Sequence, residues 1–352
     1  MSWRRLILTG FALLVATVSV AGMSNFAAAA PRATYGPPKE GAKVILGDTS
    51  IDGPAIVATN SPATALAWVG TDAAHHLNLM TSSDGLHYGS KHILPESSAW
   101  RPALAFVDSA RGAPYGTIVL AWTGTDASHT LNVEFINMPD FAVTRKVTLW
   151  GDTSFTAPAL ATVNSDVNSD VYLSWAGNDP AHTVNIMHLQ THTQIRDKHI
   201  LWGWGSLSRP NLARDLSSDN KGPLILSWLG VSHRIYYAYA SEDRSHWTMP
   251  AESPLTLQSA WAPSMIAAFA TALPTHWLAW TGSGATGTHQ LSVRYTQHFP
   301  AWSDANATTA LAEYAISSPA LVYNGDGTTN KLVMAWTGTD SQRHMNVAVI
   351  TV

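Results

Sequence analysis

Aspartate and histidine recur together at fixed positions along the sequence. Four aspartates are each followed, three or four residues later, by a histidine, in the pairs Asp72 and His75, Asp126 and His129, Asp179 and His182, and Asp340 and His344. An imidazole beside a carboxylate can bind a metal ion or transfer a proton. One pair per repeat would place the pairs on separate turns, so we favour a turn lock, in which each aspartate accepts the amides of its own turn. If the pairs instead bind ligand, their repetition predicts several equivalent sites.

A second group of reactive side chains lies just before six prolines that recur along the chain, which we call the fixed prolines: Pro54, Pro102, Pro158, Pro210, Pro263 and Pro319. This group is not repeated from unit to unit, and its members are Asp52, Trp100, Arg101, Arg209 and Trp261, with Trp202 and Trp204 slightly upstream of Arg209. Guanidinium groups bind carboxylates with two parallel hydrogen bonds, and indole faces suit sugar-like ligands. We expect a ligand-binding site made of Trp100, Arg101, Trp204, Arg209, Trp261 and Asp52. The alternative is that these residues fill and solvate the opening of a channel.

Carboxylates suited to glycoside hydrolysis are harder to identify, because this reaction uses two Asp or Glu side chains close to each other. Asp48, Glu96 and Asp152 occupy one repeated position, which predicts turn acceptors. Asp52 and Glu313 are the unrepeated acids nearest the expected opening, and the sequence shows no partner for either. The chain has no serine nucleophile elbow, phosphate loop or zinc-binding helix motif. No catalytic residue is assigned, and no metal or cofactor is expected.

The elements that position these residues follow from an internal repeat. A stretch of the form Leu-Ala-Trp-x-Gly, with small variations, occurs six times, and its tryptophans are Trp68, Trp122, Trp175, Trp228, Trp280 and Trp336. Their spacings of 54, 53, 53, 52 and 56 residues account for residues 42–352 and leave no room for a second domain. A tryptophan that recurs at the centre of a strand predicts packing between neighbouring units.

Each repeat reads as four short strands. The first follows the fixed proline, the second carries the tryptophan, the third alternates as in Leu77-Asn78-Leu79, and the fourth is of the type Lys91-His92-Ile93-Leu94. Four strands in a repeat of about 50 residues are typical of one blade of a β-propeller. The sequence therefore predicts an all-β, six-bladed β-propeller of four-stranded antiparallel blades.

The two ends of the chain together complete one blade. The sixth repeat stops at Val352 after its third strand, while residues 43–46, Lys-Val-Ile-Leu, copy the fourth-strand residues 146–149, Lys-Val-Thr-Leu. Pairing an N-terminal strand at about residues 42–47 with the last blade removes two open sheet edges. An open stack of the same repeats would have no reason to begin with an orphan fourth strand, so we predict a closed ring.

The first 30 residues have the three parts of a secretory signal peptide. Arg4 and Arg5 precede an apolar run from Leu6 to Val20, and small residues follow at 27–30. We therefore predict removal of residues 1–30, a linker at residues 31–41, and a secreted, extracellular protein. The apolar run falls short of the roughly 20 residues of a membrane span, and an uncleaved membrane anchor is the alternative.

Composition limits the partners of the mature chain. Cysteine is absent, which excludes disulfides, thiolate metal ligands and a cysteine nucleophile. Of 20 basic and 24 acidic side chains, 18 and 24 remain after residue 30, for a net charge near −6 with neutral histidine. No nucleic-acid partner is expected, because phosphate binding needs a basic surface. No membrane span is expected after signal cleavage.

The predicted ring resembles the sialidase-like and fucose-lectin-like propellers of secreted proteins along the whole mature chain. Residues 82–88, Ser-Ser-Asp-Gly-Leu-His-Tyr, and 241–247, Ser-Glu-Asp-Arg-Ser-His-Trp, are similar to the Asp-box turn of that group, Ser-x-Asp-x-Gly-x-Thr-Trp. The first departs from it by placing glycine directly after aspartate, and the second lacks glycine and is one residue short. The box is a structural turn in that group, so it supports the fold.

The resemblance also implies where an enzyme of this kind would keep its catalytic groups. Sialidases use three arginines, a tyrosine nucleophile paired with glutamate, and an acid. Arg101 and Arg209 could supply two of the arginines, and neither the third nor the Tyr-Glu pair is matched. We therefore favour a non-catalytic, lectin-like protein that binds glycans or another cell-surface ligand. The alternatives are an extracellular glycoside hydrolase or lyase, the hydrolase of sialidase-like architecture, and an extracellular scaffold that binds a protein partner.

Overall fold

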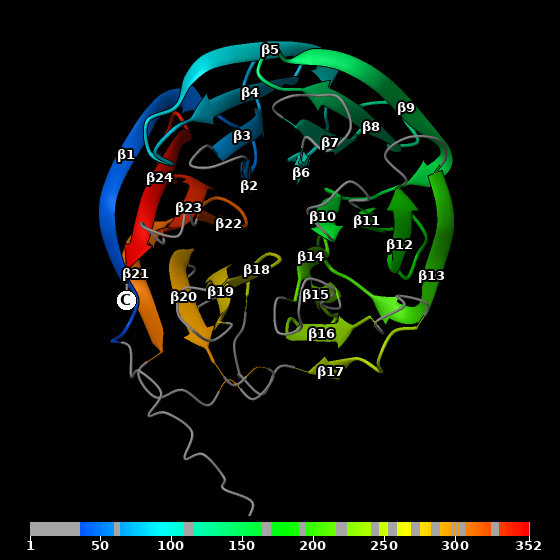
Figure 1. Cartoon of the computed structure of the whole chain (residues 1–352). Helices are drawn as coiled ribbons and strands as arrows, with labels where there is room; N and C mark the ends of the chain where they lie inside the picture. Colours follow the sequence, from blue (N-terminus) through cyan, green and yellow to red (C-terminus); the bar gives the residue numbers. More distant parts are fainter. Residues whose placement is uncertain are drawn as a thin grey trace, which may run out of the picture. The chain divides into compact units, whose positions relative to one another are not determined.

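The computed structural model describes residues 36–59, 64–108, 116–163, 170–189, 195–215, 224–240, 246–252, 259–268, 275–282, 289–297, 299, 302, 307–324 and 331–351. The strands in these ranges form six four-stranded antiparallel sheets, which are the blades of a propeller around a central channel (Figure 1). The predicted signal peptide, residues 1–30, lies outside the described ranges. Within them, no helix is long and apolar enough to cross a membrane.

Within each blade the strands run from the channel outward, beginning with the strand that follows the fixed proline. Blade 1 is β2 (Ala55–Ala58), β3 (Thr64–Val69), β4 (His76–Ser82) and β5 (Gly89–Ser97); blade 2 is β6 (Ala103–Val107), β7 (Thr117–Thr123), β8 (Thr130–Asn137) and β9 (Ala142–Thr153). Blade 3 is β10 (Ala159–Val163), β11 (Asp170–Ala176), β12 (Thr183–Leu189) and β13 (Ile195–Gly205); blade 4 is β14 (Asn211–Arg214), β15 (Leu224–Leu229), β16 (Ile235–Tyr239) and β17 (Ala251–Glu252). Blade 5 is β18 (Ser264–Ala268), β19 (Thr275–Thr281), β20 (Gln290–Thr296) and β21 (Thr308–Tyr314); blade 6 is β22 (Ala320–Asn324), β23 (Lys331–Thr337), β24 (His344–Thr351) and β1 (Lys39–Thr49).

Blade 6 joins the two ends of the chain. β1 pairs antiparallel with β24, and Val44 lies opposite Val347 and Ile45 opposite Asn346. In Figure 1 the blue strand β1 lies along the red strand β24. The ring closure predicted from the sequence is confirmed. The closing strand begins at Lys39, slightly before the predicted residue 42.

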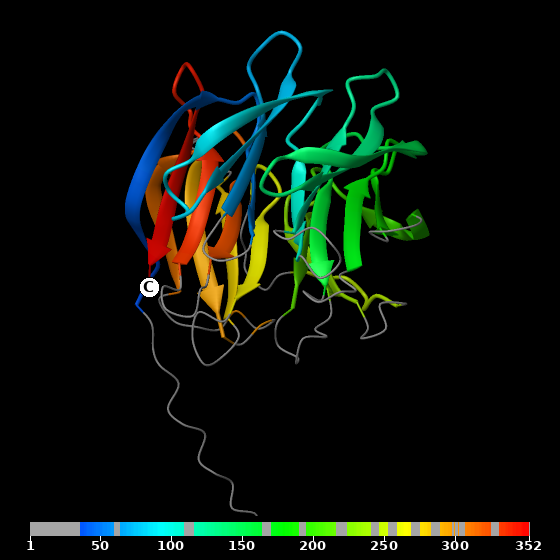
Figure 2. The same cartoon turned by 45° about the horizontal axis from the view of Figure 1, so that its top comes forward.

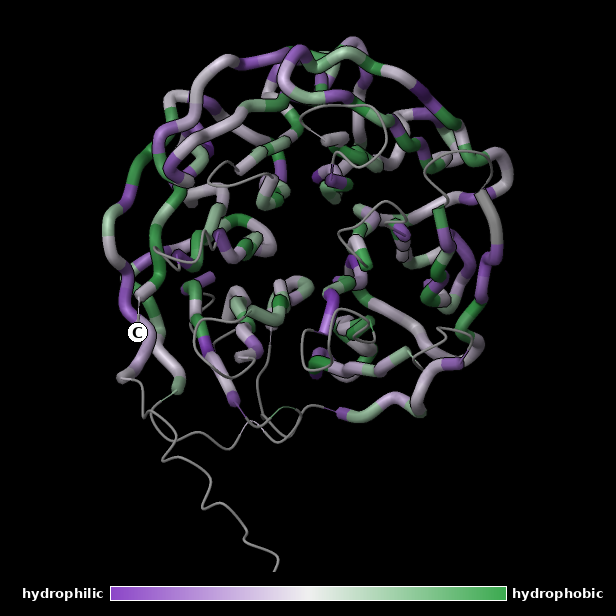
Figure 3. The backbone as a smooth tube through the Cα atoms, in the orientation of Figure 1, coloured by the Kyte–Doolittle hydropathy of each residue, from purple (hydrophilic) through white to green (hydrophobic). Residues whose placement is uncertain are grey.

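The repeated tryptophans form the core of the blades and of their boundaries. All six are at most 4% exposed. Trp68 of blade 1 packs in one apolar cluster with Leu46 and Val333 of blade 6, and Trp122 of blade 2 packs in another with Leu77 of blade 1. Figure 3 shows hydrophobic stretches within the blades, with hydrophilic residues on the outer strands and turns. The packing role predicted for these tryptophans is confirmed.

Strand direction sorts the connections onto two faces of the ring. Because successive strands are antiparallel, the turn between the second and third strands lies on the same face as the connection into the next blade. Figure 2 shows three of these turns projecting on one side, between β23 and β24 (red), β3 and β4 (blue), and β7 and β8 (teal). We call this side the turn face. The residues that precede the fixed prolines lie on it.

The first Asp-box-like stretch is a turn between β4 and β5. Asp84 Oδ1 accepts the amides of Leu86 and His87, both at 2.8 Å. Gly85 has a φ of 78°, which favours glycine. The predicted structural role is confirmed for this stretch. Most of the second stretch, residues 241–245, lies outside the described ranges.

Leu46 anchors β1 in the core, and its substitution tests the ring closure. Leu46 is 7% exposed, whereas its neighbour Ile45 is 63% exposed. Leu46→Ala is expected to lower the free energy of unfolding by about 2–4 kcal/mol, because it leaves a cavity where blade 6 meets blade 1. Ile45→Ala is the matched control, with an expected change below about 0.5 kcal/mol. Urea unfolding followed by tryptophan fluorescence measures both, and equal losses would contradict this packing.

Candidate functional site

Each turn of the turn face that carries aspartate is held by that carboxylate. Asp72 accepts the amides of Ala74 and His76 at 3.1–3.4 Å. Three further carboxylates accept the amides at the same two positions of their turns, namely Asp126, Asp179 and Asp340. Burial raises the pKa of these carboxyls, but the hydrogen bonds of the turn outweigh it and hold each pKa below its ordinary value. The predicted turn lock is confirmed.

The histidines differ from the pairing that the sequence suggested. Three of the predicted partners have a φ of 48° to 55° and close their turns in the left-handed conformation, namely His75, His129 and His182. The imidazole that meets the carboxylate in blade 1 comes one residue later, with His76 Nδ1 2.8 Å from Asp72 Oδ1. His344 Nδ1 is likewise 2.8 Å from Asp340 Oδ1. Within the described ranges, no group of three His, Asp or Glu side chains is placed to hold a metal ion.

A second set of groups repeats at the boundaries between blades. Lys91 Nζ on β5 lies 5.3 Å from the centre of the Trp68 ring in its own blade and 2.5 Å from Asp48 Oδ1 on β1 of the preceding blade. The same arrangement recurs three times, as Lys43 with Trp336 and Glu313, Lys146 with Trp122 and Glu96, and Lys198 with Trp175 and Asp152. Each lysine–indole contact stabilises its own blade by about 0.5–1 kcal/mol at a partly exposed site, while the lysine–carboxylate pair joins that blade to the preceding one. We call each set a boundary triad.

The boundary triads correct two expectations about the acids. The sequence predicts turn acceptors at Asp48, Glu96 and Asp152, but these carboxylates bind a lysine of the next blade. Glu313 was expected near the channel opening, but it occupies the equivalent position on β21 and pairs with Lys43 of blade 6. Sequence spacing showed that the positions were equivalent, but not which strand of the neighbouring blade they face.

A cleft of about 300 Å³ lies at the boundary between blades 6 and 1. Its polar lining includes the boundary pair Asp48 and Lys91 and, from the locked turn, Thr71 and Asp72. The hydroxyls of Thr49 and Thr71 meet across the boundary at 2.7 Å. Hydrogen-bond donors and acceptors therefore converge on a space whose size suits a small polyhydroxylated ligand.

Blade 4 departs from this repeat. At the position of the boundary acid, Trp204 on β13 of blade 3 stacks on Trp228 at 5.2 Å between ring centres, with an interplanar angle of 8°. Tyr236 also stacks on Trp228, at 5.8 Å. At the boundary between blades 3 and 4, Trp204 thus occupies the space that the acid and the lysine of a boundary triad occupy at other boundaries. It lies on an outer strand, apart from the channel opening with which the sequence grouped it.

At the channel opening on the turn face, Arg101 ties three blades together. Its side chain is 3% exposed, and its guanidinium donates to the carbonyl oxygens of Pro54 in blade 1 and Ser318 in blade 6, the latter at 2.7 Å. Gly53 makes room for it, because a Cβ there would lie 2.9 Å from Arg101 Nη1. Asp52 accepts the backbone amide of Arg101 at 3.0 Å. Burial lowers the pKa of Arg101 to about 10, against the opposing effect of Asp52.

Arg209 lies at the same opening in a different environment. Its side chain is 8% exposed, and it donates no hydrogen bond to any residue in the described ranges, with Nε buried and unpartnered. Burial lowers the pKa of Arg209 well below its ordinary value, and repulsion from Arg101 adds to this, while Asp52 opposes it. The structure therefore brings Arg101, Arg209 and Asp52 together, as the sequence predicted.

Trp100 and Trp261 connect the channel opening to the turns. The indole of Trp100 meets the ring of His129 edge-on at 4.7 Å, and Trp261 meets His289 in the same way at 4.5 Å. Both indoles are half-buried. Each therefore presents part of an aromatic ring on the turn face, one in blade 2 and one in blade 5.

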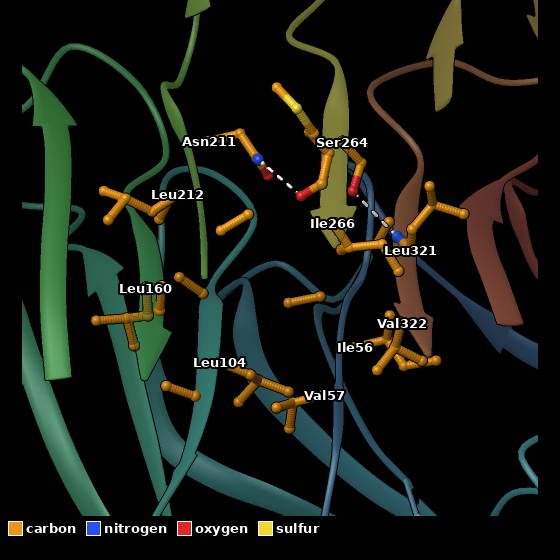
Figure 4. A pocket seen from close by; sticks show the side chains of 18 of the residues that line it. Ile56, Val57, Leu104, Leu160, Asn211, Leu212, Ser264, Ile266, Leu321 and Val322 are labelled. Atoms are coloured by element: carbon orange, nitrogen blue, oxygen red, sulfur yellow. Dashed lines mark hydrogen bonds between the residues drawn. The ribbon is translucent and has the colours of Figure 1, made fainter. Parts of the chain in front are cut away.

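The channel itself is a cavity of about 360 Å³ lined by the first strands of all six blades. Figure 4 shows aliphatic side chains such as Leu104 and Leu160 around it. Two polar side chains of its lining are bonded to the main chain, since Asn211 donates to the Met265 carbonyl at 3.1 Å and Ser264 accepts an amide of β22 at 3.1 Å. The channel is thus largely apolar, with Arg101 and Arg209 at its turn-face end and Arg214, the last residue of β14, also in its lining.

Sequence reasoning missed Glu134 on β8, whose side chain is 1% exposed. The equivalent strands carry methionine at this position, Met80 and Met187. A glutamate at a position that is otherwise apolar was the feature of the sequence that could have identified it. Lys146 Nζ is 3.7 Å from Glu134 and 2.7 Å from Glu96. Burial raises the pKa of Glu134 to about 7, and the Glu96 carboxyl acts in the same direction, against Lys146.

No known family model matches the chain, and no curated protein matches its sequence. Solved structures do match its fold. A protein of unknown function from Dyadobacter fermentans superposes with a TM-score of 0.62 at 10% identity, covering 90% of this chain and 99% of that one. A variant of Aleuria aurantia lectin in complex with Fucα1-6GlcNAc gives 0.58 at 8% identity, covering 87% and 96%. The subtype N11 neuraminidase-like protein of A/flat-faced bat/Peru gives 0.52 at 8% identity, covering 90% and 94%.

These identities show the fold alone. At that level, the resemblance to fucose-lectin-like and sialidase-like propellers is confirmed.

The buried carboxyl of Glu134 makes stability depend on pH. Its folded-state pKa of about 7 lies above the unfolded-state value of about 4.3, so its contribution is fully present below pH 4 or so and is lost as the pH rises through about 7. The free energy of unfolding of Glu134→Gln, taken relative to that of the wild type, should therefore rise by about 2–3 kcal/mol between pH 5 and pH 8. Urea unfolding at both pH values measures this. A difference that does not change with pH would contradict the assignment, and Glu252→Gln, at an exposed site, is the control.

Proposed function

We propose that the protein is a secreted, non-catalytic carbohydrate-binding protein with several equivalent sites per chain. The observation that supports this most is the recurrence of the boundary triad in four blades, each beside a turn locked by aspartate. Equivalent sites suit a ligand that is itself repeated, such as the glycans of a cell surface, because linked weak sites gain avidity. A single catalytic centre would need no such repetition.

The chemistry of the cleft between blades 6 and 1 supports a sugar as ligand. The Lys91 ammonium is a donor, the carboxylates of Asp48 and Asp72 are acceptors, and the threonine hydroxyls act as either. Sugar hydroxyls need both kinds of partner, placed close together. A glycan with fucose is the first class to examine, because a lectin of the same fold was solved with Fucα1-6GlcNAc.

The carboxylates support binding over hydrolysis. In the described part of the chain, Asp52 accepts hydrogen bonds from the amides of Gly53 and Arg101. The aspartates of the locked turns accept hydrogen bonds from amides of their own turns. Glu134, whose raised pKa would suit a general acid, is 1% exposed and lies among protein groups.

A glycoside hydrolase also needs one carboxyl of its pair to act as a general acid. Asp48 and Asp72 line the same cleft, but Asp48 is paired with Lys91 and turn hydrogen bonds hold the pKa of Asp72 below its ordinary value, which favours binding over acid catalysis.

Secretion is proposed from the N-terminal sequence. Arg4 and Arg5, the apolar run after them and the small residues at 27–30 support export. A glycan or another ligand at a cell surface would then be within reach of the mature protein.

Removal of the lysine ammonium at three boundary triads tests the proposed sites. Methionine keeps an apolar stem over each indole and removes the charge. On the mature protein, a glycan array identifies the sugar, and calorimetry with its monovalent form is expected to find four sites per chain. The combined variant Lys43→Met, Lys91→Met and Lys198→Met should retain one site and bind the immobilised glycan about 100-fold more weakly.

Lys39→Met, at an exposed position of β1, is the matched control and should keep all four sites. An unchanged stoichiometry in the combined variant would refute the boundary sites. Release of free sugar from a bound glycan would refute the non-catalytic part of the proposal.

We also propose that Trp100 and Trp261 contact the ligand near the channel opening. The double variant Trp100→Ala and Trp261→Ala should weaken glycan binding about tenfold without changing the number of sites, because an aromatic contact contributes about 0.5–1.5 kcal/mol each. Phe141→Ala is the control, since Phe141 packs on His92 at a turn of the opposite face. Unchanged affinity in the double variant would remove the channel opening from the glycan site.

A further inference from the structure

Arg209 carries a buried positive charge that the described protein groups do not satisfy. The side chain is 8% exposed, lines the channel and donates no hydrogen bond within the described ranges. Burying a charge without a partner is costly, and proteins usually pair such a charge. Arg101, its neighbour, shows the usual solution, because its guanidinium binds carbonyl oxygens of two other blades.

The charges of Arg101, Arg209 and Asp52 at the channel opening leave one positive charge without a negative partner. Arg101 and Arg209 bring two positive charges, and Asp52 brings one negative charge. Both carboxylate oxygens of Asp52 already accept amides, from Gly53 at 2.6 Å and from Arg101 at 3.0 Å. The Arg209 guanidinium therefore lacks an anion of its own.

Other polar atoms at the same opening also lack partners. The Nε of Arg101 and the hydroxyls of Ser208 and Ser317 are buried without a hydrogen bond in the described part of the chain. Ser317 Oγ lies beside the guanidinium of Arg101, since a Cβ built on Gly53 would be 2.7 Å from that hydroxyl and 2.9 Å from Arg101 Nη1. Besides Arg209, the described residues of this opening thus hold three buried polar atoms without a protein partner.

Below the arginines, the channel suits an apolar chain. Its cavity of about 360 Å³ is walled largely by aliphatic side chains of the six first strands (Figure 4). Of its polar lining, Asn211 and Ser264 are bonded to the main chain. Arg214, a third arginine in the lining, also has an interaction partner, so none of these three side chains needs a ligand. A small inorganic anion would satisfy Arg209 but leave this apolar space unused.

We propose that the central channel binds a monocarboxylate with an apolar tail, its carboxylate on Arg209 and its tail along the channel. The planar guanidinium matches a carboxylate with two parallel hydrogen bonds. One uncompensated positive charge suits a monoanion, whereas a dianionic phosphate would leave excess negative charge in an apolar site. This site is separate from the boundary triads, and its lining includes neither Trp100 nor Trp261, so it goes beyond the proposed glycan binding.

Calorimetry of the mature protein with acetate, butanoate, hexanoate and octanoate tests the proposal. Octanoate is expected to bind with one site per chain, and affinity should rise about three- to fourfold per added methylene until the channel is filled. Neutral octanol should bind at least tenfold more weakly than octanoate, because it lacks the charge that Arg209 pairs with. Acetate or inorganic phosphate binding as tightly as octanoate would overturn the apolar tail.

Arg209→Gln removes the charge and is expected to weaken octanoate binding at least tenfold. Arg343→Gln, at an exposed residue on a turn of blade 6, is the control and should leave it unchanged. Without ligand, Arg209→Gln should melt at a higher temperature than the wild type, because it removes an unpaired buried charge. Circular dichroism confirms folding; if this variant does not fold, Arg209→Lys replaces it and should bind octanoate more weakly than the wild type, because it loses the planar fork.

Octanoate binding that is absent in the wild type, or equal in the wild type and the folded Arg209 variant, would overturn the proposal. Glycan binding by the same variants distinguishes a failure of this proposal from a failure of the proposed glycan binding. Arg209→Gln should retain every glycan site, since Arg209 belongs to none of the boundary triads.

Discussion

The pairing of β1 with β24 is the constraint on which the rest of the structure depends. Without it, blade 6 would have three strands with β24 as an open edge, and blade 1 would lose the packing of Leu46 on Trp68. The pairing also builds a candidate site directly, because Asp48 on β1 meets Lys91 of blade 1 at this seam. The cleft lined by these residues therefore exists only when the two ends of the chain have come together.

In the closed ring, residues that repeat from blade to blade and residues that do not repeat have different roles. The packed tryptophan core recurs in all six blades, and among the described residues the locked turns and the boundary triads recur in four, so any ligand that these repeated groups bind is bound several times. Residues that differ between blades meet at the channel opening. Arg101 and Arg209 are the clearest example, since only two of the six equivalent positions before the fixed prolines are arginine.

The architecture could be predicted from the sequence because it rests on local, repeated signals. The spacing of the tryptophans indicated six blades, and the orphan strand near Val44 indicated how the ring closes. The aspartate turn lock was also predictable, because its partners lie within four residues. The site was less predictable, because its contacts cross between blades. Arg101 and Arg209 hold the same position in their repeats, yet only Arg101 reaches the carbonyl oxygens of other blades.

Hydrogen exchange of the native mature protein, resolved by residue, tests the closed ring most directly. β1 is the outer strand of its sheet, so alternate amides around Val44 and Ile45 donate to β24 and the others face solvent. The amides that donate to β24 should exchange as slowly as those around Val347 and Asn346, because both strands belong to one sheet that opens only on global unfolding. Rapid exchange of these β1 amides beside slow exchange along β24 would show that the N-terminal strand does not close the ring. The boundary cleft at the seam would then lose its structural basis.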